Sequence, residues 1–346
     1  MKRLQKIISF FCALCLMLLT SACSIRAEIS DMLIFGGVGI DMENGMVTLT
    51  VQAQRAGMDE TMIVLQAQGR TTSEAMSNLS EETGKVIVTS QNLVFAVGQS
   101  FMEQGRATEI DSCARQLRVR PDVLMLLSET TAADIMNARD DKGELIPLEN
   151  LRSICQNGFQ EGKGIPVRVM DWYNEFYGEA GTAFLPVIGC QSGSGWIYQG
   201  TQLLIGGEPR LLLDRKETGL YAMLSGESGT QVYTMATSQG KSASGEITAH
   251  TEMELQTGET WQMNFTIEGT NILLEETMDP ELFNSALQQD CMALLKKMEQ
   301  KDCLSFFWKK KLIKTDSQLF REVKEKEAEI PMDYSVNVLL LELQED

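Results

Sequence analysis

Cys23 is the residue whose type and position point most directly to chemistry. It follows the small residues Ser21 and Ala22, and a cationic start and an apolar stretch from about Ile7 to Leu19 come before them. These features indicate a secretory signal peptide over residues 1–22. The stretch is too short and wrongly flanked to be a spanning helix.

The thiol of Cys23 is also the group that a lipid would modify. Ser21-Ala22-Cys23 is the small-small-Cys ending of bacterial lipoproteins, in which the thiol takes a diacylglyceryl group and the peptide is cleaved before it. Thr20 stands where the strongest form of this pattern has leucine. We predict lipidation of Cys23 and tethering to a membrane by the new N-terminus. The alternative is an ordinary secretory signal followed by a spare thiol.

The other cysteines predict no disulfide framework. Cys12 and Cys15 have the C-x-x-C spacing of a redox motif, but both lie in the predicted signal peptide and would leave with it. The cysteines that remain beside Cys23 are Cys113, Cys155, Cys190, Cys291 and Cys303. Their odd number and irregular spacing indicate that most of them are buried and pack as small apolar residues. One disulfide is possible, but the sequence does not select which two cysteines would form it.

Two glycine motifs fail as nucleotide sites. Gly37-Val38-Gly39 lacks the third glycine of a dinucleotide fingerprint, because Met42 stands in its place. Gly240-Lys241-Ser242 lacks the opening glycine of a phosphate loop, because that position is Met235. The sequence also has no G-x-S-x-G elbow of a serine hydrolase.

No set of residues predicts catalysis. His250 is the only histidine, and the pattern places it on the solvent face of a strand, so a zinc site lacks ligands. Carboxylate pairs such as Asp140-Asp141 and Glu252-Glu254 are expected by chance among 48 acidic residues. We therefore expect a non-enzymatic protein with no catalytic residue, no cofactor and no metal.

The charge balance limits the partners. The formal net charge is −18, and loss of three cations with the signal peptide would give −18 − 3 = −21. Such a surface repels phosphate backbones and anionic headgroups, so we expect no nucleic acid partner and expect membrane residence to come from the lipid. The exception is the cluster Lys309-Lys310-Lys311 with Lys314, which we interpret as a solvated face and, secondarily, as a docking surface.

Elements of both types are expected along the mature chain. Apolar stripes and capping signals predict helices that begin near Thr71, Ile110, Pro147, Val169 and Asp279. A hairpin is predicted around Glu43-Asn44-Gly45, and a buried strand over Val123–Leu127. Strict alternation over Ile247–Leu255 and Trp261–Ile267 predicts an antiparallel hairpin with one solvated face.

These elements predict an α+β fold with several domains, in which mixed and antiparallel sheets carry flanking helices. The small, flexible run Gln191-Ser192-Gly193-Ser194-Gly195 is the best boundary. We expect an N-terminal α+β domain over 23–192, a small middle β region over 193–231 and a C-terminal α+β domain over 232–346.

Several stretches, in their order along the chain, resemble the C-subunit lipoproteins of spore germinant receptors, the Ger(x)C family. The matching stretches are Cys23 with Glu28-Ile29 and Asp31, Gly39-Ile40-Asp41, Gly69–Ala75, Val86–Gly98, and Gly207–Gly226 with Leu211-Leu212-Leu213 and Glu217-Thr218-Gly219-Leu220. Two sites depart from the family pattern. Ser24-Ile25 replace the usual Trp-Asp, and Asp302 and Trp308 stand in a different setting near the end.

The resemblance implies a non-enzymatic, lipid-anchored subunit of a nutrient germinant receptor on the outer face of the spore inner membrane. Its partners would be the membrane-embedded receptor subunits, and its fold three α+β domains. The competing class is a solute-binding lipoprotein of a transporter, which would need two α/β lobes around a cleft. An exported hydrolase is a third class, for which no nucleophile and base are present.

Overall fold

The computed structural model of the chain describes residues 32–55, 61–104, 107–160, 164–191, 195–226, 230–236, 242–273, 279–324 and 330–342. The predicted signal peptide, Cys23 and the residues that follow it as far as residue 31 lie outside this set. The same holds for residues 192–194 in the predicted domain boundary, and for Gly240 and Lys241.

The larger of two sheets contains most of the N-terminal strands. They are β1 (Met32–Glu43), β2 (Met46–Arg55), β3 (Met62–Gly69), β4 (Val86–Val88), β5 (Val94–Val97), β6 (Leu124–Ser128), β7 (Val167–Arg168), β8 (Thr182–Gln191), β9 (Gly195–Ile205) and β10 (Glu208–Asp214). Their order is β10-β9-β8-β6-β5-β1-β2-β3, with β4 beside β1 and β7 beside β6. Parallel and antiparallel pairs both occur, so the sheet is mixed.

The predicted first hairpin is confirmed. β1 and β2 are antiparallel, and Glu43 pairs with Met46 across the two-residue connection Asn44-Gly45. Both connecting residues have positive φ, 51° and 75°. This backbone suits a type I′ turn, whose twist matches that of the strands and which asparagine and glycine tolerate best.

Helices cover both faces of the larger sheet. They are α2 (Thr72–Thr83), α3 (Gln99–Glu103), η2 (Ala107–Glu109), α4 (Ile110–Gln116), α5 (Ala132–Met136), α6 (Leu148–Gln160) and α7 (Val169–Phe176). Side chains of α2, α3, α4 and α7 join one apolar cluster, whereas those of α5 and α6 join another. β5 and β6 alternate between the two clusters, so both of their faces are buried, as the continuous apolar run Val123–Leu127 predicts.

The smaller sheet lies in the C-terminal part of the chain. Its strands are β11 (Thr230–Ala236), β12 (Ser242–Gln256), β13 (Trp261–Leu273) and β14 (Met332–Glu342), in the order β11-β12-β13-β14. The helices of this part are α8 (Arg215–Leu224), α9 (Pro280–Glu299), α10 (Ser305–Thr315) and α11 (Ser317–Val323). β12 and β13 form the predicted antiparallel hairpin, and β14 pairs with β13 in parallel. The α+β fold class is confirmed.

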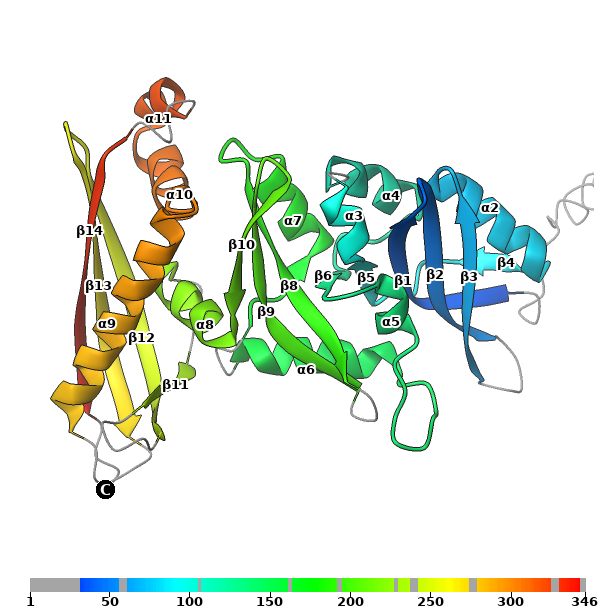
Figure 1. Ribbon diagram of the computed structural model, residues 1–346, viewed down its shortest axis with the longest axis horizontal. Helices are drawn as coiled ribbons and strands as arrows, with labels where there is room; N and C mark the ends of the chain where they lie inside the picture. Colours follow the sequence, from blue (N-terminus) through cyan, green and yellow to red (C-terminus); the bar gives the residue numbers. More distant parts are fainter. Residues whose placement is uncertain are drawn as a thin grey trace, which may run out of the picture.

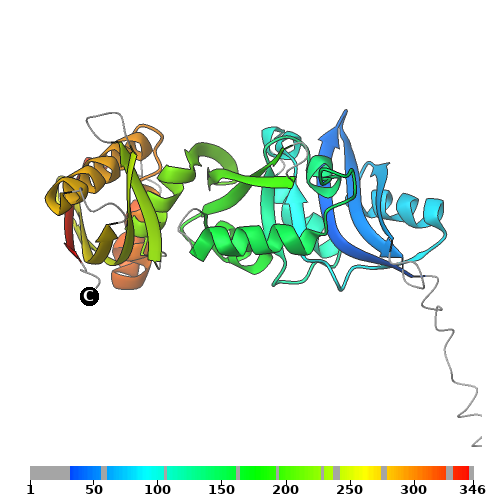
Figure 2. The same ribbon diagram turned by 90° about the horizontal axis from the view of Figure 1, so that it is seen from below.

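The two sheets follow one another along the long axis of the molecule, with α8 between them (Figure 1). The view from below shows the same succession, with α6 running along the larger sheet (Figure 2). Residues 195–214 of the expected middle β region form β9 and β10, which extend the larger sheet through antiparallel pairing with β8. Residues 215–224 are helical rather than β structure. The division into domains stays a prediction.

Asp41 is a buried carboxylate that fixes a helix on the larger sheet. It is 1% exposed, and its oxygens accept hydrogen bonds from the backbone N–H groups of Ala132 and Ala133, at 2.8 and 3.1 Å. Those groups belong to the first turn of α5 and have no partner within the helix. A Cβ on Gly98 would lie 1.7 Å from the Oδ1 of Asp41, so glycine is needed there.

Replacing Asp41 should lower stability and change its pH dependence. Asp41→Ala leaves two buried N–H groups without acceptors, which should lower the free energy of unfolding by about 2 to 4 kcal/mol. Burial raises the pKa of Asp41 above its ordinary value of 3.8, although the bonds from Ala132 and Ala133 oppose this. The folded state therefore binds the proton more tightly, and the contribution of Asp41 to stability falls as pH rises from the unfolded to the folded pKa.

Urea denaturation over a series of pH values measures both effects. Asp41→Asn is the matched control, because it keeps one acceptor but has no titrating proton. It should cost less than Asp41→Ala, and it should lack the fall in stability across that pH interval. An unchanged pH slope in Asp41→Asn would show that another group is responsible.

Candidate functional site: the joint between the sheets

Four aromatic side chains join the larger sheet to the C-terminal part, and we call them the joint. Tyr221 of α8 is fully buried, with its ring centroid 6.2 Å from Phe184 of β8. The same ring lies 6.2 Å from Phe306 and 5.5 Å from Phe307, both in α10. Such aromatic pairs stabilise beyond the area they bury. One apolar cluster consequently continues from the larger sheet through α8 into the smaller one.

Helix α8 begins at a capping signal formed by two residues close together in the sequence. The carboxylate of Asp214 accepts a hydrogen bond from the N–H of Glu217 at 2.8 Å, and that of Glu217 accepts one from the N–H of Asp214 at 3.0 Å. This reciprocal arrangement is a capping box. The Asp-x-x-Glu spacing is visible in the sequence and is typical of a helix start. We nevertheless expected a β region over 193–231, and the helix α8 lies within that range.

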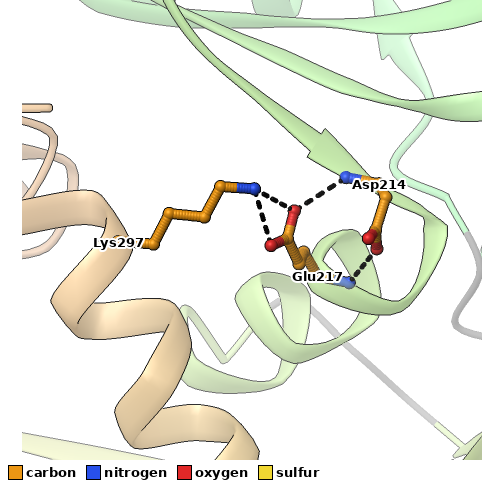
Figure 3. A network of polar contacts seen from close by, with 3 residues as sticks. All are labelled: Asp214, Glu217 and Lys297. Carbon is orange, nitrogen blue, oxygen red and sulfur yellow. Dashed lines mark hydrogen bonds and ion pairs between the residues drawn. The ribbon is translucent and has the colours of Figure 1, made fainter.

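Glu217 also connects α8 to α9. The Nζ of Lys297 lies 2.6 and 2.7 Å from the two carboxylate oxygens of Glu217, so this one carboxylate both caps α8 and binds α9 (Figure 3). A second ion pair reinforces the contact, because the Nζ of Lys216 lies 2.6 Å from Asp290 of α9. Tyr233 of β11 donates a hydrogen bond to the same carboxylate. Burial, and then the bond to Asp290, raise the pKa of Tyr233.

The predicted basic cluster lies on α10, and its solvated interpretation is wrong for two of its lysines. Lys309 is only 6% exposed, and its Nζ lies 5.7 Å from the centroid of the Trp308 ring. Lys310 forms an ion pair with Glu175 of α7 at 2.9 Å, and its Nζ lies 5.7 Å from the centroid of the Phe184 ring. Lys310 therefore connects the C-terminal part to the larger sheet.

The other two lysines line a groove beside the joint. Lys311 is half-buried and Lys314 is exposed, and neither has a carboxylate within ion-pair distance among the described residues. The groove has a volume of about 750 Å³, which lies in the range of small-molecule sites. Phe307 and Met253 contribute apolar surface, and Glu179 contributes the opposite charge. We call this the joint groove.

The other sequence candidates do not come together. His250 is exposed on β12, as expected for a surface histidine. Asp140 accepts hydrogen bonds from the N–H groups of Lys142 and Glu144, so its carboxylate stabilises a turn. Within the part of the chain that the structure describes, no three His, Cys, Asp or Glu side chains are grouped to hold a metal ion. Among the described residues, no helix has the length and apolar composition needed to cross a bilayer.

The cysteines within the described ranges are free thiols. Cys113, Cys155, Cys291 and Cys303 are buried, as predicted for small apolar residues, whereas Cys190 is exposed. Burial raises the pKa of Cys155 to about 12, and burial with the nearby Asp134 and Glu129 raises that of Cys190 to about 11. These thiols are poor nucleophiles at neutral pH. The predicted lipidation of Cys23 lies outside the described residues.

Comparison with known proteins gives three consistent likenesses. Residues 26–189 match the family model of the spore germination protein N-terminal domain. YfkR of Bacillus subtilis (strain 168), whose name assigns it to spore germination, is 26% identical over 151 residues. That match covers 40% of this chain and only 39% of YfkR.

The third likeness is to a solved structure, the crystal structure of the GerBC protein. It covers 88% of this chain and 97% of that one, with a TM-score of 0.57 and 16% sequence identity. At this identity the likeness concerns the fold alone. It nevertheless extends over both sheets, whereas the family model ends at residue 189, within β8.

Reversing the charge of Lys310 should weaken the joint. Lys310→Glu places a second carboxylate beside Glu175, so we expect a loss of about 1 kcal/mol and faster hydrogen exchange in α7 and α10. The double variant Glu175→Lys, Lys310→Glu should restore most of the protection. Lys314→Glu is the matched control, because Lys314 lies on the same helix and has no ion-pair partner among the described residues, and it should leave α7 unchanged. Equal effects of Lys310→Glu and Lys314→Glu would contradict a role for this ion pair.

Proposed function

The chain belongs to the Ger(x)C family of spore germination proteins, and we propose that it is the lipid-anchored C subunit of a nutrient germinant receptor. The family match carries this proposal. It begins at residue 26, three residues after Cys23, so cleavage before Cys23 would leave the matched region whole. In the proposal, the subunit works through protein contacts with membrane-embedded receptor subunits at the spore inner membrane and catalyses no reaction.

The anchor is the physical basis of the proposed role. Two acyl chains at roughly 0.8 kcal/mol per buried CH₂ hold a soluble body stably at a bilayer. Residues 24–31 separate Cys23 from β1, and eight residues span at most about 30 Å. Tethering would therefore keep the larger sheet near the membrane and raise the effective concentration of its contact surfaces.

The elongated shape supports a role in contact between subunits. β1 and the smaller sheet lie in opposite halves of the molecule (Figure 1). An anchor ahead of β1 would leave the smaller sheet available to partners at a distance from the tether. Because the formal charge is −18, the body would not bind anionic headgroups by itself, and the lipid would supply the membrane affinity.

The joint groove favours a second candidate, a solute-binding lipoprotein of a transporter. Its volume of about 750 Å³ would suit a small nutrient. Against this candidate, the smaller sheet has an exposed face on β12 and β13 rather than the α/β lobe of a solute binder. Calorimetric titration of the purified chain with amino acids and sugars separates the two, since tight, saturable binding of one compound would favour the solute binder.

Removing the thiol should release the protein from the membrane. Cys23→Ala cannot accept a diacylglyceryl group, so we expect the chain to leave the membrane fraction and nutrient-triggered germination to fall strongly. Cys190→Ala, at an exposed thiol outside the signal, is the matched control and should change neither. Fractionation of spore membranes and the rate of germination measure the two outcomes. A Cys23→Ala chain that stayed in the membrane fraction and supported normal germination would contradict the anchoring proposal.

A further inference from the structure

A second groove lies along the free edge of β11, and it shares no lining residue with the joint groove. Within the described residues β11 pairs with β12 alone, so its other edge has no strand beside it. One wall of the groove is four consecutive residues of this strand, Gln231–Thr234, and the other is a face of α8. Its volume is about 260 Å³, which is below the usual range of small-molecule sites. We call it the edge groove.

A free edge by itself does not identify a docking site, because β3 and β14 also lie at sheet edges. Its unpaired N–H and C=O groups can nevertheless bind the main chain of an added strand. At β11 the edge coincides with a neighbouring helix, since α8 lies beside the strand (Figure 1). The charges in the groove and a buried amide distinguish it further.

The wall that α8 forms has an apolar part and a cationic end. Gly219 and Leu220 lie four and three residues before Met223, so these three residues share one face of the helix. Because glycine has no side chain, another backbone can approach the helix closely at Gly219. Arg215 and Lys216 occupy the N-terminal end of the same helix.

The edge groove is cationic in an acidic protein. Arg215 and Lys216 are its only charged lining residues, whereas the whole chain has a formal charge of −18. Lys216 is held by its ion pair with Asp290, and its Nζ lies 5.4 Å from the centroid of the Tyr233 ring. Within the described residues Arg215 has no ion-pair partner, and its Nε donates to the carbonyl of Tyr198. Its terminal nitrogens can therefore bind a carboxylate through two hydrogen bonds.

Gln231 adds an unpaired donor to the strand wall. Its side chain is only 4% exposed, and its Nε2 has no hydrogen-bond partner among the described residues. A buried donor that lacks an acceptor lowers stability. A peptide oxygen bound in the groove would supply an acceptor on this wall, so the amide points to a ligand.

We propose that the edge groove binds an extended acidic segment of a partner protein, which adds a strand to β11. The main chain of the segment pairs with the free edge, a carboxylate binds Arg215, and an apolar side chain lies over Leu220 and Met223. Charge complementarity selects this occupant, because the cations at the end of α8 attract an acidic segment and repel a basic one. Only the biological partner rests on the proposed contact between receptor subunits.

Random octapeptides displayed on phage, selected against the purified full chain in detergent micelles, test this proposal. Peptides rich in acidic and β-branched residues should be enriched, and fluorescence anisotropy then measures the dissociation constant of the tightest one. Arg215→Gln with Lys216→Gln should raise that constant by about tenfold or more. Lys311→Gln with Lys314→Gln is the matched control, because it removes the same charge from the joint groove, and it should leave binding unchanged.

Backbone methylation of the selected peptide makes the test independent of folding defects. In an added strand, alternate N–H groups point towards β11 and the others point away. N-methyl groups on one alternate set should therefore abolish binding, whereas the same number on the other set should be tolerated. Circular dichroism checks that both double variants are folded.

Four results would overturn the proposal. They are a selection that enriches no peptide, enriched peptides without acidic residues, equal weakening by the two double variants, and equal effects of the two methylated sets. Binding lost in the control variant alone would also contradict it, because the peptide would then occupy the joint groove. A dimer of the chain that the peptide dissociates would instead assign the edge to a second copy. The proposed role in germination would be unaffected, because the test uses no receptor subunit.

Discussion

The relative placement of the two sheets depends on the ring of Tyr221. It is fully buried, contacts Phe184 on the larger sheet and contacts Phe306 and Phe307 on α10, so three elements far apart in sequence meet at one side chain. Ion pairs connect the same elements: Glu217 of α8 binds Lys297 of α9, and Lys310 of α10 binds Glu175 of α7. We expect aromatic packing to contribute more to stability than these partly exposed ion pairs, which contribute little by themselves.

The joint determines how a lipid anchor at the N-terminus would affect the position of the smaller sheet. A lipid on Cys23 would hold only the part of the chain that follows it, and β1 and the larger sheet come first. Because one apolar cluster runs from that sheet into the smaller one, the smaller sheet would be held in a defined direction instead of swinging on a linker. A subunit that acts by contact benefits from such stiffness, since fixed geometry lowers the entropy lost on binding.

Local patterns in the sequence predicted the elements better than the connections between them. The Thr71 capping position, the Asn44-Gly45 turn and the alternation over Ile247–Ile267 depend on neighbouring residues, and the structure contains the corresponding helix and hairpins. The run at 191–195 was interpreted as a boundary, but β8 and β9 pair on either side of it. That pairing is a long-range contact that the composition of the run does not reveal, and the division into domains stays a prediction.

The candidate site was less predictable for the same reason. Four lysines close together suggested a solvated face, yet Lys309 is buried with its Nζ over the Trp308 ring. Glu175, more than 130 residues earlier, pairs with Lys310. Tyr221 gave no signal as a bridge, because its partners belong to β8 and α10. The Asp214 and Glu217 pair, by contrast, was a local signal that could have revealed α8.

The central claim is that a lipid at the N-terminus fixes this acidic body to a membrane as a receptor subunit. Mass spectrometry of the N-terminal peptide, taken from the chain in membranes of the producing cell, tests it most directly. The account predicts a peptide that begins at Cys23 and carries the mass of a diacylglyceryl group. A peptide that retains residues 1–22, or that begins elsewhere with an unmodified thiol at Cys23, would contradict it.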